Sequence, residues 1–216
     1  MQISLVQKSI LAAALLALLP LPSQSQHSSL PSPAAQAALW LQVSPTASAP
    51  HFDPITLEPG QVEVIQALLL NRAEPDGWGC EDDVPPDDWL KELTYSKIAL
   101  TPTATTILVQ AGKTCGRTGK DGINVAMWIF TLRPGAAPVL LAAPQDSFNG
   151  ALYSIQPTLS SGFPDLVVTW KLADSVDEST LTYFRFDGKI YQPIAAATLS
   201  TAGAPHITPI HIPEEP

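Results

Sequence analysis

Positive charge is scarce in this chain. Its 216 residues include 11 lysines and arginines against 20 aspartates and glutamates, which gives a formal net charge of -9. Nucleic-acid phosphates and anionic membrane surfaces are both bound through lysine and arginine, so this balance argues against either partner. The excess of carboxylates favours solubility, or a weak attraction to cations.

Histidine is also scarce and is badly placed for catalysis. The four histidines lie in or beside proline-rich terminal segments, at His27, His51, His206 and His211. A Ser-His-Asp or Cys-His site needs its base held rigidly beside the nucleophile. The signatures HExxH, GxSxG, GxxxxGK[ST] and GxGxxG are missing as well. The sequence therefore argues against a zinc or serine hydrolase, and its histidines identify no catalytic residue and no metal site.

Cysteine occurs only twice, at Cys80 and Cys115. No second cysteine lies two or three residues from either, so the usual zinc spacing is absent. An even number of cysteines in an exported chain predicts a disulfide, with free thiols or a metal pair as the alternatives. The loop-entropy relation gives about 3.8 kcal/mol of stabilisation for a closure of this length.

Long apolar runs are missing too, except near the first residue. Residues 10–21 (ILAAALLALLPL) follow Lys8 and precede a small-x-small pattern at Ser23 and Ser25. These are the three parts of a secretory signal peptide, and the apolar run is shorter than the ~20 residues that cross a bilayer. We expect residues 1–25 to be removed, with export to the periplasm or medium. A retained anchor is the alternative.

Proline is abundant, with 22 residues, and gathers towards both ends of the remaining chain. Residues 26–51 are rich in Ser, Pro and Ala and predict a flexible leader, with one helical turn over residues 34–41. Residues 193–216 predict an extended proline-rich tail. Residues 52–192 are then expected to form a single domain, long enough to bury a core.

Apolar residues of that domain follow a helical period first and a strand period afterwards. Val62, Ile65 and Leu69 recur at i, i+3 and i+7 and predict a short amphipathic helix. Later apolar runs are short and separated by turn residues, which predicts an antiparallel meander. The expected strands cover residues 97–100, 105–111, 124–132, 139–142, 152–156, 165–170, 180–186 and 189–192. The predicted fold class is mainly β: a meander of about eight strands, closing as a barrel or a sandwich, after a short helix.

Two of these strands carry finer predictions. Residues 124–132 are apolar on both faces, which predicts a central strand covered on both sides. Asp187 and Gly188 predict a two-residue hairpin turn, which would place Phe184 opposite Tyr191.

The densest group of carboxylates lies between the predicted helix and the strands, where no lysine or arginine separates Arg72 from Lys91. Such carboxylates repel one another unless they are solvated or bridged by a hard cation such as calcium. The candidate calcium ligands are Glu81, Asp82, Asp83, Asp87 and Asp88. The EF-hand spacing is not met, and a solvated loop tip is the alternative. No other cofactor is expected.

Two further sets of side chains are candidates for binding or catalysis. Trp78 and Trp89 belong to the acidic stretch and are candidate ligand-binding aromatics, with packing against the disulfide as the alternative. Asp165, Glu178 and Asp187 are the carboxylates that a glycosidase-like pair would use. Ordinary structural roles at a strand start, in a polar loop and in a turn are the alternative for these three.

Three segments resemble a recurrent pattern in secreted bacterial proteins of unknown function. They are residues 122–130 (GINVAMWIF), 162–168 (GFPDLVV) and 181–191 (LTYFRFDGKIY). The resemblance covers residues 105–191 and implies a periplasmic or secreted β-rich module, without a catalytic residue to carry over. FG-GAP-type propeller blades are a weaker likeness, because their calcium loop is missing before Pro164.

These observations predict an exported, mainly β module that binds a protein, peptide or glycan and has no enzymatic activity. The alternative is a carboxylate-based hydrolase acting on an envelope or extracellular polymer.

Overall fold

The structure is a computed structural model that describes residues 30–72, 85–113, 117–118, 124–144, 148–171 and 175–210. The predicted signal peptide, residues 1–25, lies outside these ranges. Three α-helices, one 3-10 helix and eleven strands occur within them. In chain order they are α1 (Pro33–Trp40), β1 (Asp53–Pro54), α2 (Pro59–Arg72), α3 (Pro86–Trp89), η2 (Leu90–Glu92), β2 (Thr94–Ile98), β3 (Thr105–Gln110), β4 (Arg117–Thr118), β5 (Asn124–Leu132), β6 (Val139–Ala142), β7 (Asn149–Ser160), β8 (Phe163–Lys171), β9 (Glu178–Phe186), β10 (Tyr191–Ser200) and β11 (His206–Ile210).

The strands form one antiparallel sheet. Its path runs β1-β2-β3-β5-β7-β8-β9-β10-β11, and β4 and β6 also pair with β5. The predicted fold class, a mainly β antiparallel meander after a helix, is confirmed. Within the described residues β1 and β11 do not pair with each other, so the sheet stays open.

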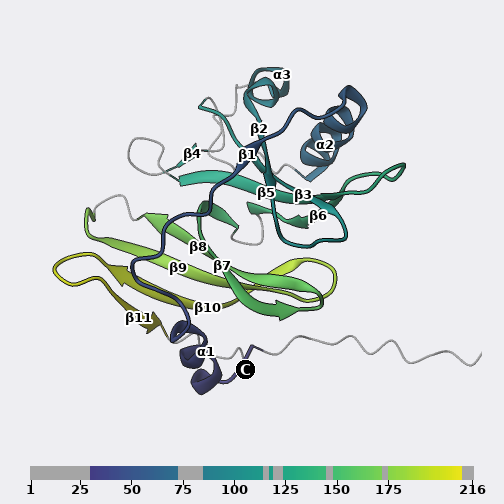
Figure 1. The fold of residues 1–216 in the computed structure, drawn as a ribbon. Helices are drawn as coiled ribbons and strands as arrows, with labels where there is room; N and C mark the ends of the chain where they lie inside the picture. Colours follow the sequence, from purple (N-terminus) through teal and green to yellow (C-terminus); the bar gives the residue numbers. More distant parts are fainter. Residues whose placement is uncertain are drawn as a thin grey trace, which may run out of the picture.

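The sheet bends sharply where β5 meets β7, because these two strands pair only at Val125–Gly150 and Ala126–Asn149. The bend produces two layers, one of β1, β2, β3, β5 and β6 and one of β7 to β11 (Figure 1). Met127 and Ile129 of the first layer share a buried cluster with Leu166 and Phe184 of the second. The two layers therefore pack face to face, as in a sandwich.

Gly150 and Asn124 fix this bend. Gly150 has φ 106°, and a Cβ there would lie 2.2 Å from the Thr169 carbonyl oxygen, which no ordinary side chain permits. The buried Asn124 amide donates to the Lys171 carbonyl and accepts from the Lys171 N–H, both at 2.9 Å. Asn124 thereby replaces a missing strand pair between the two layers.

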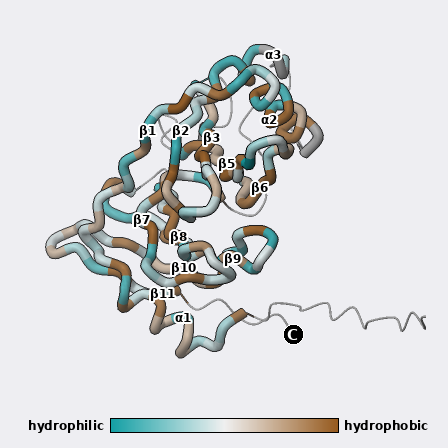
Figure 2. Tube along the Cα trace, turned by 45° about the vertical axis from the view of Figure 1, so that its right-hand side comes forward, coloured by the Kyte–Doolittle hydropathy of each residue, from teal (hydrophilic) through white to brown (hydrophobic). Residues whose placement is uncertain are grey.

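β5 is covered on both faces, as its sequence predicted. Trp128 and Phe130 pack towards α2 in one cluster, and Met127 and Ile129 pack towards the second layer in another. Figure 2 shows the hydrophobic positions of β3, β5 and β6 gathered in the interior, between α2 and the layer of β7 and β8. A strand buried on both sides reads as a continuous apolar run, which explains why it was predictable.

α2 is the amphipathic helix that the sequence predicted. Its Ile65 and Leu69 are fully buried against β3 and β5, and Val62 and Leu68 are half-buried beside them. Among the described residues, no helix has both the length and the apolar character needed to cross a membrane.

Both terminal segments are more ordered than their proline content suggested. α1 lies within residues 26–51, and its Trp40, with Val43 beyond it, is buried against β8, β9 and β10. At the other end, β10 and β11 carry the sheet to Ile210. The folded unit therefore extends beyond residues 52–192 in both directions. Apolar burial orders these segments, and it depends on tertiary contacts that composition does not reveal.

The predicted hairpin register at Asp187 is wrong. Tyr191 pairs with Phe186, and Phe184 pairs with Pro193 instead of Tyr191. The Asp187 Oδ1 accepts the N–H groups of Lys189 and Ile190 at 2.7 and 2.8 Å, which extends the turn over residues 187–190.

A two-residue turn does occur in an earlier hairpin, between β7 and β8. Ser161 and Gly162 have φ angles of 49° and 84°, and they follow the Ser160–Phe163 pair. Positive φ at both positions is the conformation that matches the twist of the flanking strands.

Candidate functional site

Several residues singled out by the sequence lie outside the described residues: Trp78, Cys80, Glu81, Asp82, Asp83 and Cys115. The disulfide and the calcium site therefore stay predictions. The side chain of Asp87 is not described either, and Asp88 is exposed, with Lys91 Nζ 3.7 Å from its Oδ1. Within the part of the chain that is described, no three His, Cys, Asp or Glu side chains lie close enough to hold a metal ion.

Trp89 lies in the core, packed beside α2. Its side chain is 5% exposed and belongs to the cluster of Ile65, Leu69 and Trp128. Little of its ring surface is therefore available to a ligand.

The three candidate carboxylates are not brought together. Glu178 begins β9, whereas Asp165 on β8 lies opposite Arg185, one residue beyond the Leu166–Phe184 pair. At the usual strand rise, Glu178 and Arg185 are about 23 Å apart along β9. Asp187 lies two residues beyond Arg185 and is therefore further still from Glu178. A glycosidase pair needs a separation of ~5–9.5 Å. Glu178 thus cannot act with either of the other two carboxylates.

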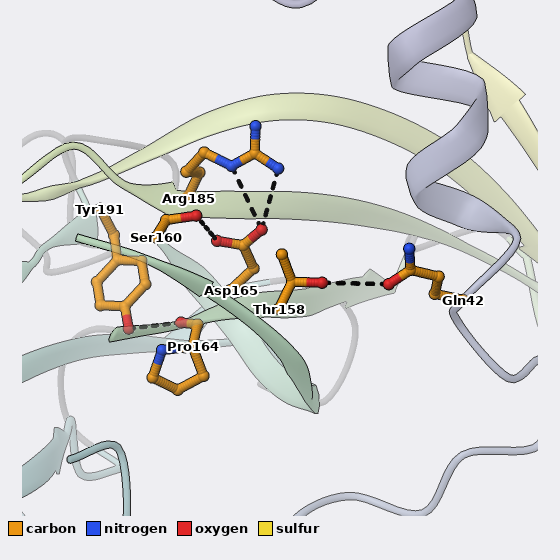
Figure 3. A network of polar contacts seen from close by, with 7 residues as sticks. All are labelled: Gln42, Thr158, Ser160, Pro164, Asp165, Arg185 and Tyr191. Carbon is orange, nitrogen blue, oxygen red and sulfur yellow. Dashed lines mark hydrogen bonds and ion pairs between the residues drawn. The ribbon is translucent and has the colours of Figure 1, made fainter. Parts of the chain in front are cut away.

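Asp165 is the centre of a buried polar network (Figure 3). Its Oδ1 accepts a hydrogen bond from Ser160 Oγ at 2.7 Å. Its Oδ2 accepts from Arg185 Nε and Nη2 at 3.3 and 3.1 Å. The Asp165 side chain is 0% exposed and that of Arg185 is 36% exposed. The network ties the neighbouring strands β7, β8 and β9 together and leaves no carboxylate oxygen of Asp165 without a partner.

Two buried tyrosines lie close to this carboxylate. Tyr191 donates its hydroxyl proton to the Pro164 carbonyl at 2.8 Å. Burial, with a smaller contribution from the Asp165 charge, raises the pKa of Tyr183 to about 12 and raises the pKa of Tyr191 as well. Both hydroxyls are therefore neutral near pH 7. The side chains of Ser160, Asp165, Arg185 and Tyr191 are all hydrogen-bonded, and this geometry describes a structural element of the sheet.

A concave surface lies in the other layer, between the start of α2 and the turn that joins β5 to β6. This main groove has a volume of about 920 Å³. One wall comes from residues 55–58, 60, 61 and 64, and the other from residues 105 and 132–138. The turn wall is shaped by Gly135, whose φ is 69°, and by a hydrogen bond from the Ala136 N–H to the Arg133 carbonyl at 3.2 Å.

A second depression, of about 430 Å³, continues the main groove along the loop between β2 and β3. It is lined by residues 97–99, 101–106 and 132–134, and we call it the threonine depression. The two hollows share Thr105, Leu132, Arg133 and Pro134. The two hollows are therefore neighbours, and Arg133 belongs to the lining of both.

The lining consists of small, aliphatic, proline and threonine residues, together with Gln61 and three charged side chains. Lys97 lies in the threonine depression, Arg133 at the junction and Glu58 in the main groove. The sequence pattern singled out none of these three residues as a candidate for binding or catalysis. The groove arises from the packing of α2 beside β5 and β6, and no local sequence motif predicts that packing.

Comparison with protein-family models, with curated proteins and with solved structures gives no match for this chain. The resemblance to secreted bacterial proteins therefore stays a prediction. The groove and its functional interpretation rest on geometry and chemistry alone.

Proposed function

We propose that this chain is an exported binding module whose main groove holds an extended segment of another protein. The observation that carries the proposal is that the main groove and the threonine depression, of about 920 and 430 Å³, are neighbouring hollows that share Thr105 and residues 132–134 in their lining. An elongated open site suits an extended polypeptide better than a compact small molecule, which is usually enclosed.

The lining supports a polypeptide as the occupant. The turn at residues 133–137 is exposed and contains alanine and glycine, so a second backbone can approach its N–H and C=O groups closely. Ile55 and the 38% exposed Val64 offer apolar contacts for alternate side chains of such a segment. This combination of backbone groups and small apolar patches is typical of sites that bind extended peptides.

The proposed location follows from the sequence. A signal peptide over residues 1–25 and a disulfide between Cys80 and Cys115 both belong to a protein that works outside the cytoplasm. The partner is then an envelope or extracellular protein.

A display library of random peptides about twelve residues long, ~40 Å when extended, tests this function. Peptides are selected on the wild-type chain and then measured against Ala136→Trp, which places an indole in the main groove. Ala202→Trp, in the exposed loop between β10 and β11, is the matched control. We expect Ala136→Trp to weaken the selected peptides by about tenfold or more, equivalent to ~1.4 kcal/mol, and Ala202→Trp to leave them unchanged.

Equal peptide affinity for Ala136→Trp and wild type would overturn the proposal. A glycan array that binds the protein, combined with a peptide selection that fails, would overturn it as well and would favour a glycan as the ligand.

A further inference from the structure

The threonine depression differs in charge from the rest of the molecule. Its described lining contains Lys97 and Arg133 and no aspartate or glutamate. The whole chain has almost twice as many acidic as basic residues, 20 against 11. Positive charge is thus concentrated here against the general composition, which creates a local attraction for anions.

Neither cation is neutralised by the residues described around it. Both side chains are exposed, and among the described residues neither has a carboxylate within 4.0 Å. Asp53 lies opposite Lys97 in the register of β1 and β2, but its Oδ1 is 3.6 Å from His51 Nε2 instead. Lys97 and Arg133 are therefore available to an anionic group of a partner.

Hydrogen bonds shape the loop between β2 and β3 before any ligand binds. The Thr101 and Thr103 hydroxyls lie 2.9 Å apart, and the Thr103 N–H donates to Thr101 Oγ1 at 3.3 Å. The Thr106 hydroxyl donates to the Ile98 carbonyl and accepts the N–H of Leu100. A loop that is ordered in advance costs less entropy when a ligand binds.

We infer that the threonine depression is a carboxylate subsite, in which an aspartate, a glutamate or the terminal carboxylate of the bound segment lies between Arg133 and Lys97. This inference rests on the proposed function, since the depression and the main groove share Arg133. Glu58 lines the main groove, so an acidic residue is repelled there and favoured at the opposite end. The partner is thus an extended polypeptide whose acidic group lies in the threonine depression.

Charge variants of the protein and of the selected peptides test the inference by fluorescence anisotropy at low salt. Replacing the acidic residue of a peptide by its amide is expected to weaken binding about fivefold, the usual limit for an exposed ion pair. Arg133→Glu is expected to weaken the acidic peptide about tenfold, because repulsion replaces attraction. Lys171→Glu is the matched charge control, because the exposed Lys171 is hydrogen-bonded through its backbone to Asn124, at the opposite end of β5 from Arg133, and it is expected to leave affinity unchanged. Amidation of the peptide terminus separates a terminal carboxylate from a side-chain carboxylate.

The possible failures are distinguishable. If Ala136→Trp abolishes peptide binding while Arg133→Glu and peptide amidation change nothing, the carboxylate subsite is overturned and the groove function stands. If no peptide is selected, the proposed function fails. The carboxylate subsite is then tested by titrating the protein with N-acetyl-aspartate and recording NMR spectra. Shifts of the Thr103 and Arg133 amide signals that saturate in wild type and vanish in Arg133→Glu would support an anion site by itself. The lack of such shifts would overturn the subsite as well.

Discussion

A single buried carboxylate orders three strands of the second layer. Asp165 receives hydrogen bonds from Ser160 on β7 and from Arg185 on β9, and both of its oxygens are engaged. Buried ion pairs add little net stability compared with apolar side chains, but breaking one is costly because a charge is left without its partner. The Asp165–Arg185 ion pair instead fixes the register of β9 against β8, since a shift of β9 by one residue would move Arg185 to the other face of the sheet.

Asp165→Asn is expected to lower the free energy of unfolding by about 2–3 kcal/mol. The amide cannot neutralise Arg185, although the partial exposure of Arg185 to water limits the cost. Urea unfolding followed by circular dichroism measures the change.

The matched control is Asp177→Asn, an exposed carboxylate between β8 and β9, with an expected effect within ~0.5 kcal/mol. Equal stability of the two variants would contradict a stabilising role for the Asp165 network.

At the scale of elements, α1 is held to the second layer mainly by apolar contact. Trp40 meets the ring of Tyr183 edge-on, with ring centroids 5.7 Å apart. Hydrogen bonds from Tyr153 to the Ser44 carbonyl and from Thr158 to the Gln42 side chain hold the chain just after the helix.

The same contact leaves three buried polar atoms without a hydrogen bond, Gln36 Oε1, Trp40 Nε1 and the Tyr183 hydroxyl. The Tyr183 hydroxyl lies near Thr158 and Asp165 without hydrogen-bonding geometry to either. Each such atom costs about 1–3 kcal/mol, so burial of the Trp40 ring has to outweigh them.

Trp40→Ala is therefore expected to destabilise the protein by about 3 kcal/mol and to release α1 from the sheet. Denaturant unfolding gives the free-energy change, and faster hydrogen exchange of the β10 and β11 amides would report the release. Leu41→Ala is the control, because Leu41 is 89% exposed, and its expected effect is within ~0.5 kcal/mol. Similar values for the two variants would show that α1 contributes no stability.

For the whole molecule, the predicted Cys80–Cys115 disulfide would join the segment after α2 to the segment between β3 and β4. Reduction is expected to lower the melting temperature, with about 3.8 kcal/mol as the loop-entropy value. A Cys80→Ser, Cys115→Ser variant provides the control, since its melting temperature should not respond to the reductant. Mass spectrometry that finds two free thiols in the protein isolated from its native source would contradict the prediction.

Local pattern was sufficient for the elements that bury a continuous face. β5 and β6 begin and end where the sequence predicted, and α2 follows its apolar period. β1 and β4, of two residues each, and β11, exposed with Pro209 near its end, carry no such pattern and were missed. The strand predicted at residues 189–192 overlaps β10 only at its start, because the buried Ala195 and Ala197 further along β10 are weak strand signals.

The sequence by itself determined the mainly β class, the buried central strand and the covering helix, because side-chain period records which face of an element is buried. Only the tertiary structure decided the bend at Gly150, the docking of α1, the separation of Glu178 from Asp165 and the groove beside Arg133. Each of these depends on which segments, far apart in the sequence, pack together. That packing is determined by the complementary shapes of their surfaces, which cannot be deduced from any one local stretch of sequence.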